Sequence, residues 1–208
     1  ELGIDYVRRP TGGRAVLHDD ELTYSVAISE SLLPGDVIRT YRVLSQGLLA
    51  GMRSLGAKAE MVSLEGQTPQ QKLESMSSAA CFNSPSWYEV VVDGKKIVGS
   101  AQTRKEGTIL QHGSILLGMD AGKLFTVLKT PEKLRPRLIR AFLSKATGLN
   151  DALGRQVSWD EAWRAVGEGF GEALGLDIHP GELLPWEEQR AKELEHEKYA
   201  SDSWNLRK

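Results

Sequence analysis

The sequence contains a single cysteine, Cys81, among its 208 residues. An internal disulfide needs two cysteines, and a CxxC-type zinc site also needs more than one, so both are excluded. Cys81 is therefore a buried inert thiol, a reactive thiol or an incidental residue. A reducing, cytoplasmic location fits all three alternatives.

Two other features are missing. With 26 basic and 28 acidic residues, the chain lacks the basic surplus that marks nucleic-acid-binding proteins. No apolar run approaches the length that spans a bilayer, and the first residues, ELGIDYVRRP, lack the apolar core of a signal peptide. We therefore expect a cytoplasmic protein that binds neither nucleic acid nor membrane.

The pattern of apolar and turn residues predicts strands first and helices last. Asp93-Gly94 favours a two-residue hairpin turn, so at least part of the sheet should be antiparallel. Ser158-Trp-Asp-Glu161 is typical of a capping box at the start of a helix. Strands that are segregated from helices indicate an α+β fold, in one domain over 1–208. The predicted strands are 3–8, 13–18, 22–29, 88–92, 96–102 and 108–117, and the predicted helices are 36–56, 131–146, 158–175 and 187–199.

A glycine-rich loop lies between the first two predicted strands. Gly12 and Gly13 let the backbone approach a ligand, and their amides can form a nest for an anion. Arg8, Arg9 and Arg14 add positive charge beside it. The alternative is an ordinary hairpin with solvated arginines, because a short glycine-rich loop is a weak signal.

Cys81 follows Ala79 and Ala80, which leave room for a substrate, and it precedes a Ser-Pro-Ser stretch that indicates a loop. One interpretation is a nucleophile. The other is a small buried hydrophobic residue, which is the usual state of a free cysteine.

Lys95 and Lys96 should point to opposite faces of their strand, so one can stay in water while the other faces inward. An inward lysine is costly unless it has a partner or a role. Gly99 in the middle of the strand indicates close approach of backbone or ligand. The alternative is that both lysines belong to an exposed hairpin tip.

Four histidines are present, and none has the spacing of a zinc site, so we expect no metal. His18 and His112 could face a common site, whereas His179 and His196 lie in a loop and in a charged helix. A structural imidazole remains the alternative for each of them.

Taken together, these segments resemble one family. The order RRPTGGRAVLHD, ACF, GKKIVGSAQ and QHGSILL is similar to the biotin/lipoate protein ligase and octanoyltransferase superfamily, and most similar to its cysteine-dependent octanoyltransferases. The resemblance covers nearly the whole chain, including KYASDSWN at 198–205. Members usually carry a further N-terminal segment, and we expect that this chain lacks it.

The resemblance implies a mixed, mostly antiparallel sheet packed with helices. It implies that Cys81 accepts the acyl group and that Lys96 is the site lysine of the superfamily. Substrate-binding roles are implied for the loop that lines the acyl and pantetheine channel and for the strands beside it: Arg9, Thr11, Gly12, Gly13, Arg14, His18, Gly99, Ser100, Ala101 and His112.

The implied reaction moves octanoyl from acyl-carrier protein, through a thioester on Cys81, to a lysine of a lipoyl-carrier protein such as the glycine-cleavage H protein. It needs no cofactor. Lys96 would stabilise the thiolate and the developing oxyanion. Because acyl-carrier protein is normally acidic, we expect a basic docking rim of Arg8, Arg9, Arg14, Lys95, Arg104 and Lys105.

Three alternatives remain open. An ATP-dependent lipoate-protein ligase would form an acyl-adenylate and need no cysteine. A lipoyl-domain amidotransferase would use a similar thiol to move octanoyl between lipoyl domains. A non-catalytic subunit would bind lipoyl domains without turnover.

Overall fold

The computed structural model describes residues 3–63, 88–128 and 130–207. Cys81 lies outside these ranges. The chain divides into two compact units, a terminal unit of Glu1–Thr11 with His179–Lys208 and a larger unit of Gly12–Ile178.

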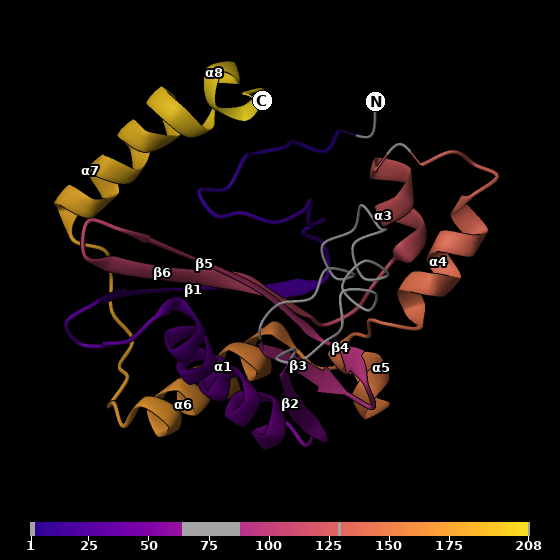
Figure 1. Cartoon of the computed structure of the whole chain (residues 1–208), viewed down its shortest axis with the longest axis horizontal. Helices are drawn as coiled ribbons and strands as arrows, with labels where there is room; N and C mark the ends of the chain where they lie inside the picture. Colours follow the sequence, from indigo (N-terminus) through magenta and orange to yellow (C-terminus); the bar gives the residue numbers. More distant parts are fainter. Residues whose placement is uncertain (1–2, 64–87, 129, 208) are drawn as a thin grey trace. The chain divides into compact units, whose positions relative to one another are not determined.

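Two three-stranded sheets form the centre of the larger unit (Figure 1). The first has the order β1 (Glu21–Ser29), β6 (Thr108–Leu116) and β5 (Val98–Lys105). The second has the order β2 (Ala59–Ser63), β3 (Tyr88–Val92) and β4 (Lys95–Lys96). All pairings within the described sheets are antiparallel, and parallel pairing occurs only at an isolated bridge between Lys96 and Ala146. The predicted α+β fold is confirmed.

The hairpin between β3 and β4 has the predicted two-residue turn. Asp93 and Gly94 both take positive φ, 49° and 72°, as a type I′ turn requires. This turn fixes the register, in which Val92 pairs with Lys95 and Val91 with Lys96. The side-chain direction of both lysines follows from it.

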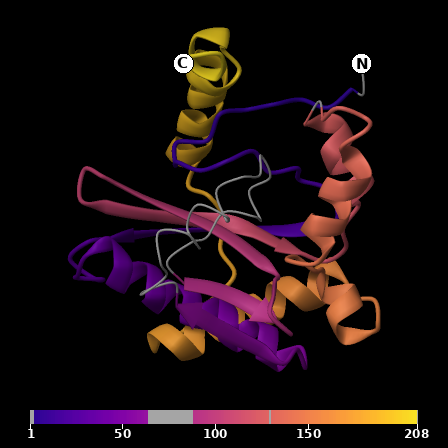
Figure 2. The same cartoon turned by 45° about the vertical axis from the view of Figure 1, so that its right-hand side comes forward.

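Helices α1 (Val37–Ser54) and α6 (Trp159–Leu174) pack together on one face of the first sheet (Figures 1 and 2). Their apolar faces and the inward residues of the strands form the main core, as the helical spacing predicts. The two helices approach closely because glycine lies at the contact. A Cβ on Gly169 would lie 2.4 Å from the carbonyl oxygen of Gly47.

Short helices build a second, smaller core. Helix α3 (Ala121–Val127) and helix α4 (Arg135–Leu143) bury Leu124, Phe125 and Phe142 against the end of β6. The sequence predicts a helix over 131–146, and the structure has a shorter one. Helix α3, helix α5 (Leu149–Leu153) and strand β2 were not predicted.

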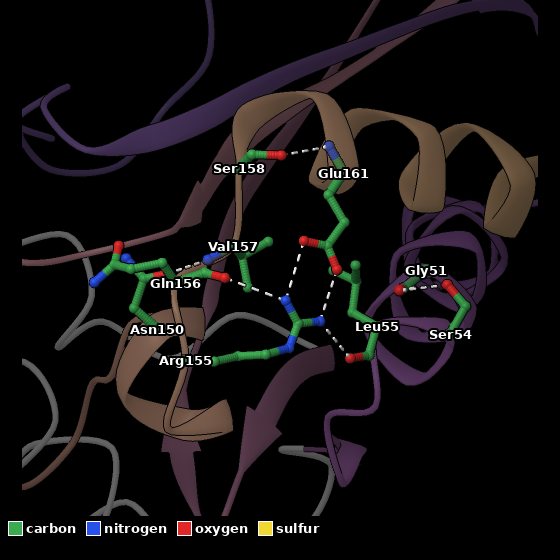
Figure 3. Close-up of polar contacts among 9 residues, drawn as sticks. All are labelled: Gly51, Ser54, Leu55, Asn150, Arg155, Gln156, Val157, Ser158 and Glu161. Carbon is green, nitrogen blue, oxygen red and sulfur yellow. Dashed lines mark hydrogen bonds and ion pairs between the residues drawn. The ribbon is translucent and has the colours of Figure 1, made fainter.

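An arginine joins the end of α1 to the start of α6 (Figure 3). Arg155 donates to both carboxylate oxygens of Glu161, at 3.0 and 2.6 Å, and to the carbonyl oxygen of Leu55 at 3.2 Å. The Ser158 hydroxyl accepts from the Glu161 amide, so this half of the predicted capping box is confirmed. The Glu161 side chain binds Arg155 instead of completing the box.

In the terminal unit, α7 (Pro185–Leu194), the π-helix η2 (Glu195–Tyr199) and α8 (Asp202–Asn205) follow one another. The predicted charged helix over 187–199 is confirmed, although its last turn is wider than an α-helix. The predicted strand at 3–8 is wrong, because this segment forms its hydrogen bonds with α8 rather than with a sheet. The predicted strand at 13–18 is also wrong, with a single bridge residue, Ala15.

Candidate active site

Lys96 faces the interior, whereas Lys95 is exposed, so the alternation predicted from the sequence is confirmed. Only 4% of Lys96 is exposed, and its ammonium nitrogen lies 2.7 Å from the Glu89 carboxylate. The hairpin register places Glu89 and Lys96 on the same face, since Val91 opposes Lys96 and Glu89 lies two residues before Val91. Glu89 was not among the residues predicted for the site.

The backbone of Lys96 is held on both sides. Its amide donates to the carbonyl oxygen of Lys145 at 2.7 Å, and its carbonyl accepts from the amide of Thr147 at 3.0 Å. The next amide, of Ile97, donates back to Val90 at 3.1 Å. These bonds fix the lysine between the β3–β4 hairpin and the segment that follows α4.

The face of the first sheet opposite α1 and α6 is here called the site face. Strand register brings Ala101 of β5, His112 of β6 and Ser25 of β1 side by side on it. Two residues further along these strands, Gly99 of β5 pairs with Ser114 of β6, and both lie on the same face. Three of the predicted site residues, Gly99, Ala101 and His112, are therefore neighbours although the sequence separates them.

Ser100 points to the other side of the sheet. Its hydroxyl accepts from the Tyr24 hydroxyl at 2.7 Å, and its carbonyl accepts from the Tyr41 hydroxyl at 3.3 Å. Burial raises the pKa of Tyr24, so this hydroxyl stays protonated and able to donate. The Gln111 amide donates in turn to Tyr24 at 3.2 Å. The Ser100 side chain thus belongs to a buried polar chain under the sheet.

A buried carboxylate orders one end of the site face. The Glu21 side chain is 4% exposed, and its Oε1 atom lies 2.5 Å from Nδ1 of His18. Glu21 also accepts hydrogen bonds from the hydroxyls of Thr23 and Ser114. The His18 side chain remains 61% exposed, and its bond to Glu21 holds the ring at the rim of the site face. Sequence reasoning missed Glu21, although its position three residues after His18 was a usable signal.

A small cavity adjoins this end. About 40 Å³ of space lies between the segment around Leu17 and the smaller core. Its lining combines apolar side chains such as Leu116, Leu124 and Phe142 with the acidic residues Asp19, Asp20, Glu21 and Asp120. Such a space holds a few water molecules.

The predicted glycine-rich loop crosses between the two units. Gly12, Gly13 and Arg14 belong to the larger unit, and Gly13 has φ 104°, a conformation that suits glycine. Arg9 and Thr11 belong to the terminal unit, where the Arg9 guanidinium donates to the Thr11 hydroxyl at 3.0 Å.

The residue before Arg9 is bound by α8. The Arg8 amide donates to Oδ1 of Asn205 at 2.9 Å, and the Arg8 carbonyl accepts from the Trp204 indole at 2.6 Å. The Arg8 guanidinium donates to the carbonyl oxygen of Arg207 at 2.5 Å. Lys198 lies 4.0 Å from the centroid of the Trp204 ring, which stabilises this arrangement by a cation–π contact.

Among residues 3–63, 88–128 and 130–207, no cluster of three or more His, Cys, Asp or Glu side chains could hold a metal ion. No helix in the described part of the chain is long and apolar enough to cross a membrane.

Residues 1–171 match the model of the lipoyl protein ligase A/B catalytic domain, which is most of the chain. The chain belongs to this family. Within the lipoyl protein ligase A/B family, octanoyltransferase LipM of Kyrpidia tusciae is 54% identical over 99% of this chain and 76% of its own length. Octanoyltransferase LipM of Bacillus subtilis is 46% identical over all of this chain and 76% of its own length.

Solved structures of the family share the fold. A bipartite lipoate protein ligase from Thermoplasma acidophilum, solved with its E2 lipoyl domain, is 29% identical with a TM-score of 0.79, over 99% of this chain and 73% of that one. A lipoate-protein ligase A bound with ATP is 28% identical with a TM-score of 0.77, over 98% of this chain and 72% of that one. The superfamily indicated by the motifs is therefore confirmed.

Proposed function

We propose that this chain is an octanoyltransferase of lipoate biosynthesis that moves octanoyl from acyl-carrier protein, through a thioester on Cys81, to a lysine of a lipoyl-carrier protein. The octanoyltransferase activity is supported by relatives named LipM that are 44–54% identical over nearly the whole chain. The acceptor is supported by the T. acidophilum ligase, which was solved with its E2 lipoyl domain. The glycine-cleavage H protein as acceptor, the carrier as donor and a cytoplasmic location belong to the proposal.

The proposed chemistry proceeds in two transfers. The Cys81 thiolate attacks the carbonyl carbon of the carrier thioester, and the tetrahedral oxyanion collapses to release the pantetheine thiolate, which takes up a proton. The acceptor lysine amine then attacks the octanoyl-Cys81 carbonyl. Its amide bond forms, the amine loses a proton, and the Cys81 thiolate is released for the next cycle.

The observation that carries this proposal is the inward lysine on β4. Its ammonium is held by Glu89 and by backbone bonds on both sides, so it is pre-positioned rather than mobile. The ammonium donates a hydrogen bond to the Glu89 carboxylate, which keeps its charge in place. A fixed cation beside a developing oxyanion supplies the electrostatic term that is usually the largest in acyl transfer.

The site face supplies the surroundings. Gly99 lies on this face, where it pairs with Ser114 of β6. Ala101 and His112 lie beside them, and His18 at the rim is oriented by Glu21. We propose that these residues contact the acyl and pantetheine parts of the donor, together with the loop from Arg9 to Arg14.

The test is intact-mass analysis of the protein after incubation with octanoyl-acyl-carrier protein. We expect one octanoyl adduct on the wild type and none on Cys81→Ala, and we expect Lys96→Met to form the adduct much more slowly. Exposed Lys58, on the same unit, provides the matched Lys58→Met control, which should retain the wild-type rate. Transfer by Cys81→Ala at the wild-type rate would eliminate the thioester route.

One observation favours a second candidate, the ATP-dependent ligase, because a structural relative was solved with ATP bound. This enzyme would octanoylate the acceptor from free octanoate with ATP and magnesium. Incubation under those conditions, without any acyl-carrier protein, separates the two reactions. We expect no product, and octanoylated acceptor there would replace the transferase by the ligase.

A further inference from the structure

Helix α4 and its flanks concentrate positive charge. Residues 131–145 contain five basic side chains and one acidic one, Glu132, in a chain whose net charge is −2. The five are Lys133, Arg135, Arg137, Arg140 and Lys145. This stretch is therefore strongly basic, whereas the chain as a whole is slightly acidic.

These charges face outward. Helix α4 buries Phe142 in the smaller core, while Lys133, Arg137, Arg140 and Lys145 are exposed. None of these four side chains has a carboxylate partner among residues 3–63, 88–128 and 130–207. Four exposed like charges within thirteen residues, with no carboxylate partner in the described part of the chain, indicate a surface for an anionic ligand.

The basic rim expected from the sequence is largely occupied by contacts within the chain. The Arg8 guanidinium binds backbone carbonyls of Asn205 and Arg207. Arg104 donates to the Thr40 hydroxyl at 2.9 Å, and Lys105 lies 3.1 Å from Glu106. Of that rim, Lys95 is exposed and Lys105 remains largely exposed beside Glu106, whereas α4 and its flanks present four exposed charges.

The segment that follows α4 is hydrogen-bonded to the candidate active site. The carbonyl of Lys145 accepts from the Lys96 amide, and Thr147 donates back to the Lys96 carbonyl. A partner that rests on α4 is therefore docked next to the lysine that is proposed to act on the thioester.

We propose that α4 and its flanks, residues 133–145, form the docking surface for the acidic carrier protein that presents the acyl thioester. This inference rests on the proposed function. A carrier of this kind offers carboxylates and the phosphodiester of its pantetheine arm. Arginine is suited to both groups, because its guanidinium donates two parallel hydrogen bonds.

A membrane surface is the less favoured occupant. Helix α4 has only nine residues, and its apolar face is used in the smaller core. The exposed apolar side chains on this stretch, Leu134 and Leu143, lie at opposite ends and form no continuous face for lipid.

The experiment measures binding of a carrier whose octanoyl group is attached through an amide, which cannot be transferred. Fluorescence anisotropy of the labelled carrier gives Kd for the full chain, its Arg137→Glu/Arg140→Glu variant and a matched Lys58→Glu/Lys192→Glu control. Both variants change the net charge by the same amount. We expect the α4 variant to bind about tenfold more weakly at low salt, which corresponds to about 1.4 kcal/mol, and the control to bind like the wild type. The difference should shrink in about 0.5 M salt because the charges are exposed.

The neutral variant Arg137→Gln/Arg140→Gln, which introduces no repulsion, should give an intermediate loss. A second readout is the ratio of kcat/KM for the carrier donor to kcat/KM for uncharged octanoyl-N-acetylcysteamine, which should fall about tenfold in the charge-reversal variant. This ratio separates loss of docking from damage to the reacting groups.

Two failures are distinguishable. If the wild type transfers octanoyl but the α4 variants bind the carrier as tightly as the control, the docking inference is overturned and the proposed function stands. If the wild type binds the carrier through α4 but forms no octanoyl adduct, the proposed function fails instead. Loss of binding to the lipoyl acceptor or to anionic vesicles, with carrier binding intact, would assign α4 to another partner and overturn the inference.

Discussion

The ion pair between Lys96 and Glu89 allows stability and activity to be separated by mutation. The two side chains are 5% and 16% exposed, and their charged atoms lie 2.7 Å apart. Replacing Glu89 by leucine would leave the ammonium in the interior without this carboxylate. Replacing both residues, in Glu89→Leu/Lys96→Met, would remove the buried charges together.

The magnitudes differ sharply between these variants. Removing one partner of a buried pair typically costs 3–5 kcal/mol, whereas replacing the pair by apolar residues of similar volume is often neutral. Because Glu89 keeps some contact with water, we expect the lower value, about 3 kcal/mol, for Glu89→Leu. The double variant should lie within about 1 kcal/mol of the wild type.

Urea unfolding monitored by tryptophan fluorescence measures these differences. With a slope of about 3 kcal/mol per molar urea, the single variant should unfold at about 1 M lower urea than the wild type. Octanoyl transfer is then measured on the same preparations. The double variant should be nearly as stable as the wild type yet strongly impaired in transfer, because it lacks the Lys96 ammonium.

The reasoning is refuted if Glu89→Leu loses less than about 1 kcal/mol, since the pair would then behave as an exposed one. It is also refuted if the stability lost by the double variant equals the sum of the losses in Glu89→Leu and Lys96→Met. Such additivity would mean that the two residues are not coupled. A stable double variant with full activity would remove Lys96 from the mechanism.

The remaining predictions concern the framework. Arg155 lowers the pKa of Glu161 below its usual 4.5, chiefly by hydrogen bonding, so the stabilisation is present above that value and is lost as pH falls through the folded-state pKa. The difference in Tm between the wild type and Arg155→Met should therefore shrink in thermal scans below pH 4.5. Gly113→Ala should destabilise the protein by about 1–3 kcal/mol in urea, because the new Cβ would meet the Gly99 carbonyl oxygen at 2.2 Å. The matched control is Gly167→Ala in α6, because no atom lies within 4 Å of the Cβ that this substitution adds. It should stabilise the protein by about 0.5–1 kcal/mol, since alanine favours a helix more than glycine does. Equal losses in both variants would contradict the packing argument.

The sequence was sufficient to predict those parts of the fold that depend on contacts between residues close together in the chain. The Asp93-Gly94 turn and the alternation of Lys95 and Lys96 follow from two-residue geometry, and the structure has both. The same register, extended by two residues, would have identified Glu89 as the partner of Lys96. This part of the site was within reach of the sequence.

Contacts between residues far apart in the chain could not be predicted from the sequence. The aromatic and branched residues at 3–8 look like a strand, but their chain binds α8 through side chains such as Trp204 and Asn205. Helix α3 is short and gains its stability from the smaller core rather than from intrinsic propensity. The clustering of charge on α4 was visible in the sequence, but coordinates were needed to show that the described residues place no carboxylate beside these charges.

The hydrogen bonds between α8 and Arg8 join residues 197 positions apart, directly before Arg9. During synthesis, Arg8 leaves the ribosome long before Asn205 is made. The bonds that anchor the start of the glycine-rich loop can therefore form only when translation of α8 is finished. Chains that are truncated or stalled before α8 would carry every element of the larger unit yet leave the start of this loop without these bonds, so C-terminal deletions and fusions should be designed to leave α8 intact.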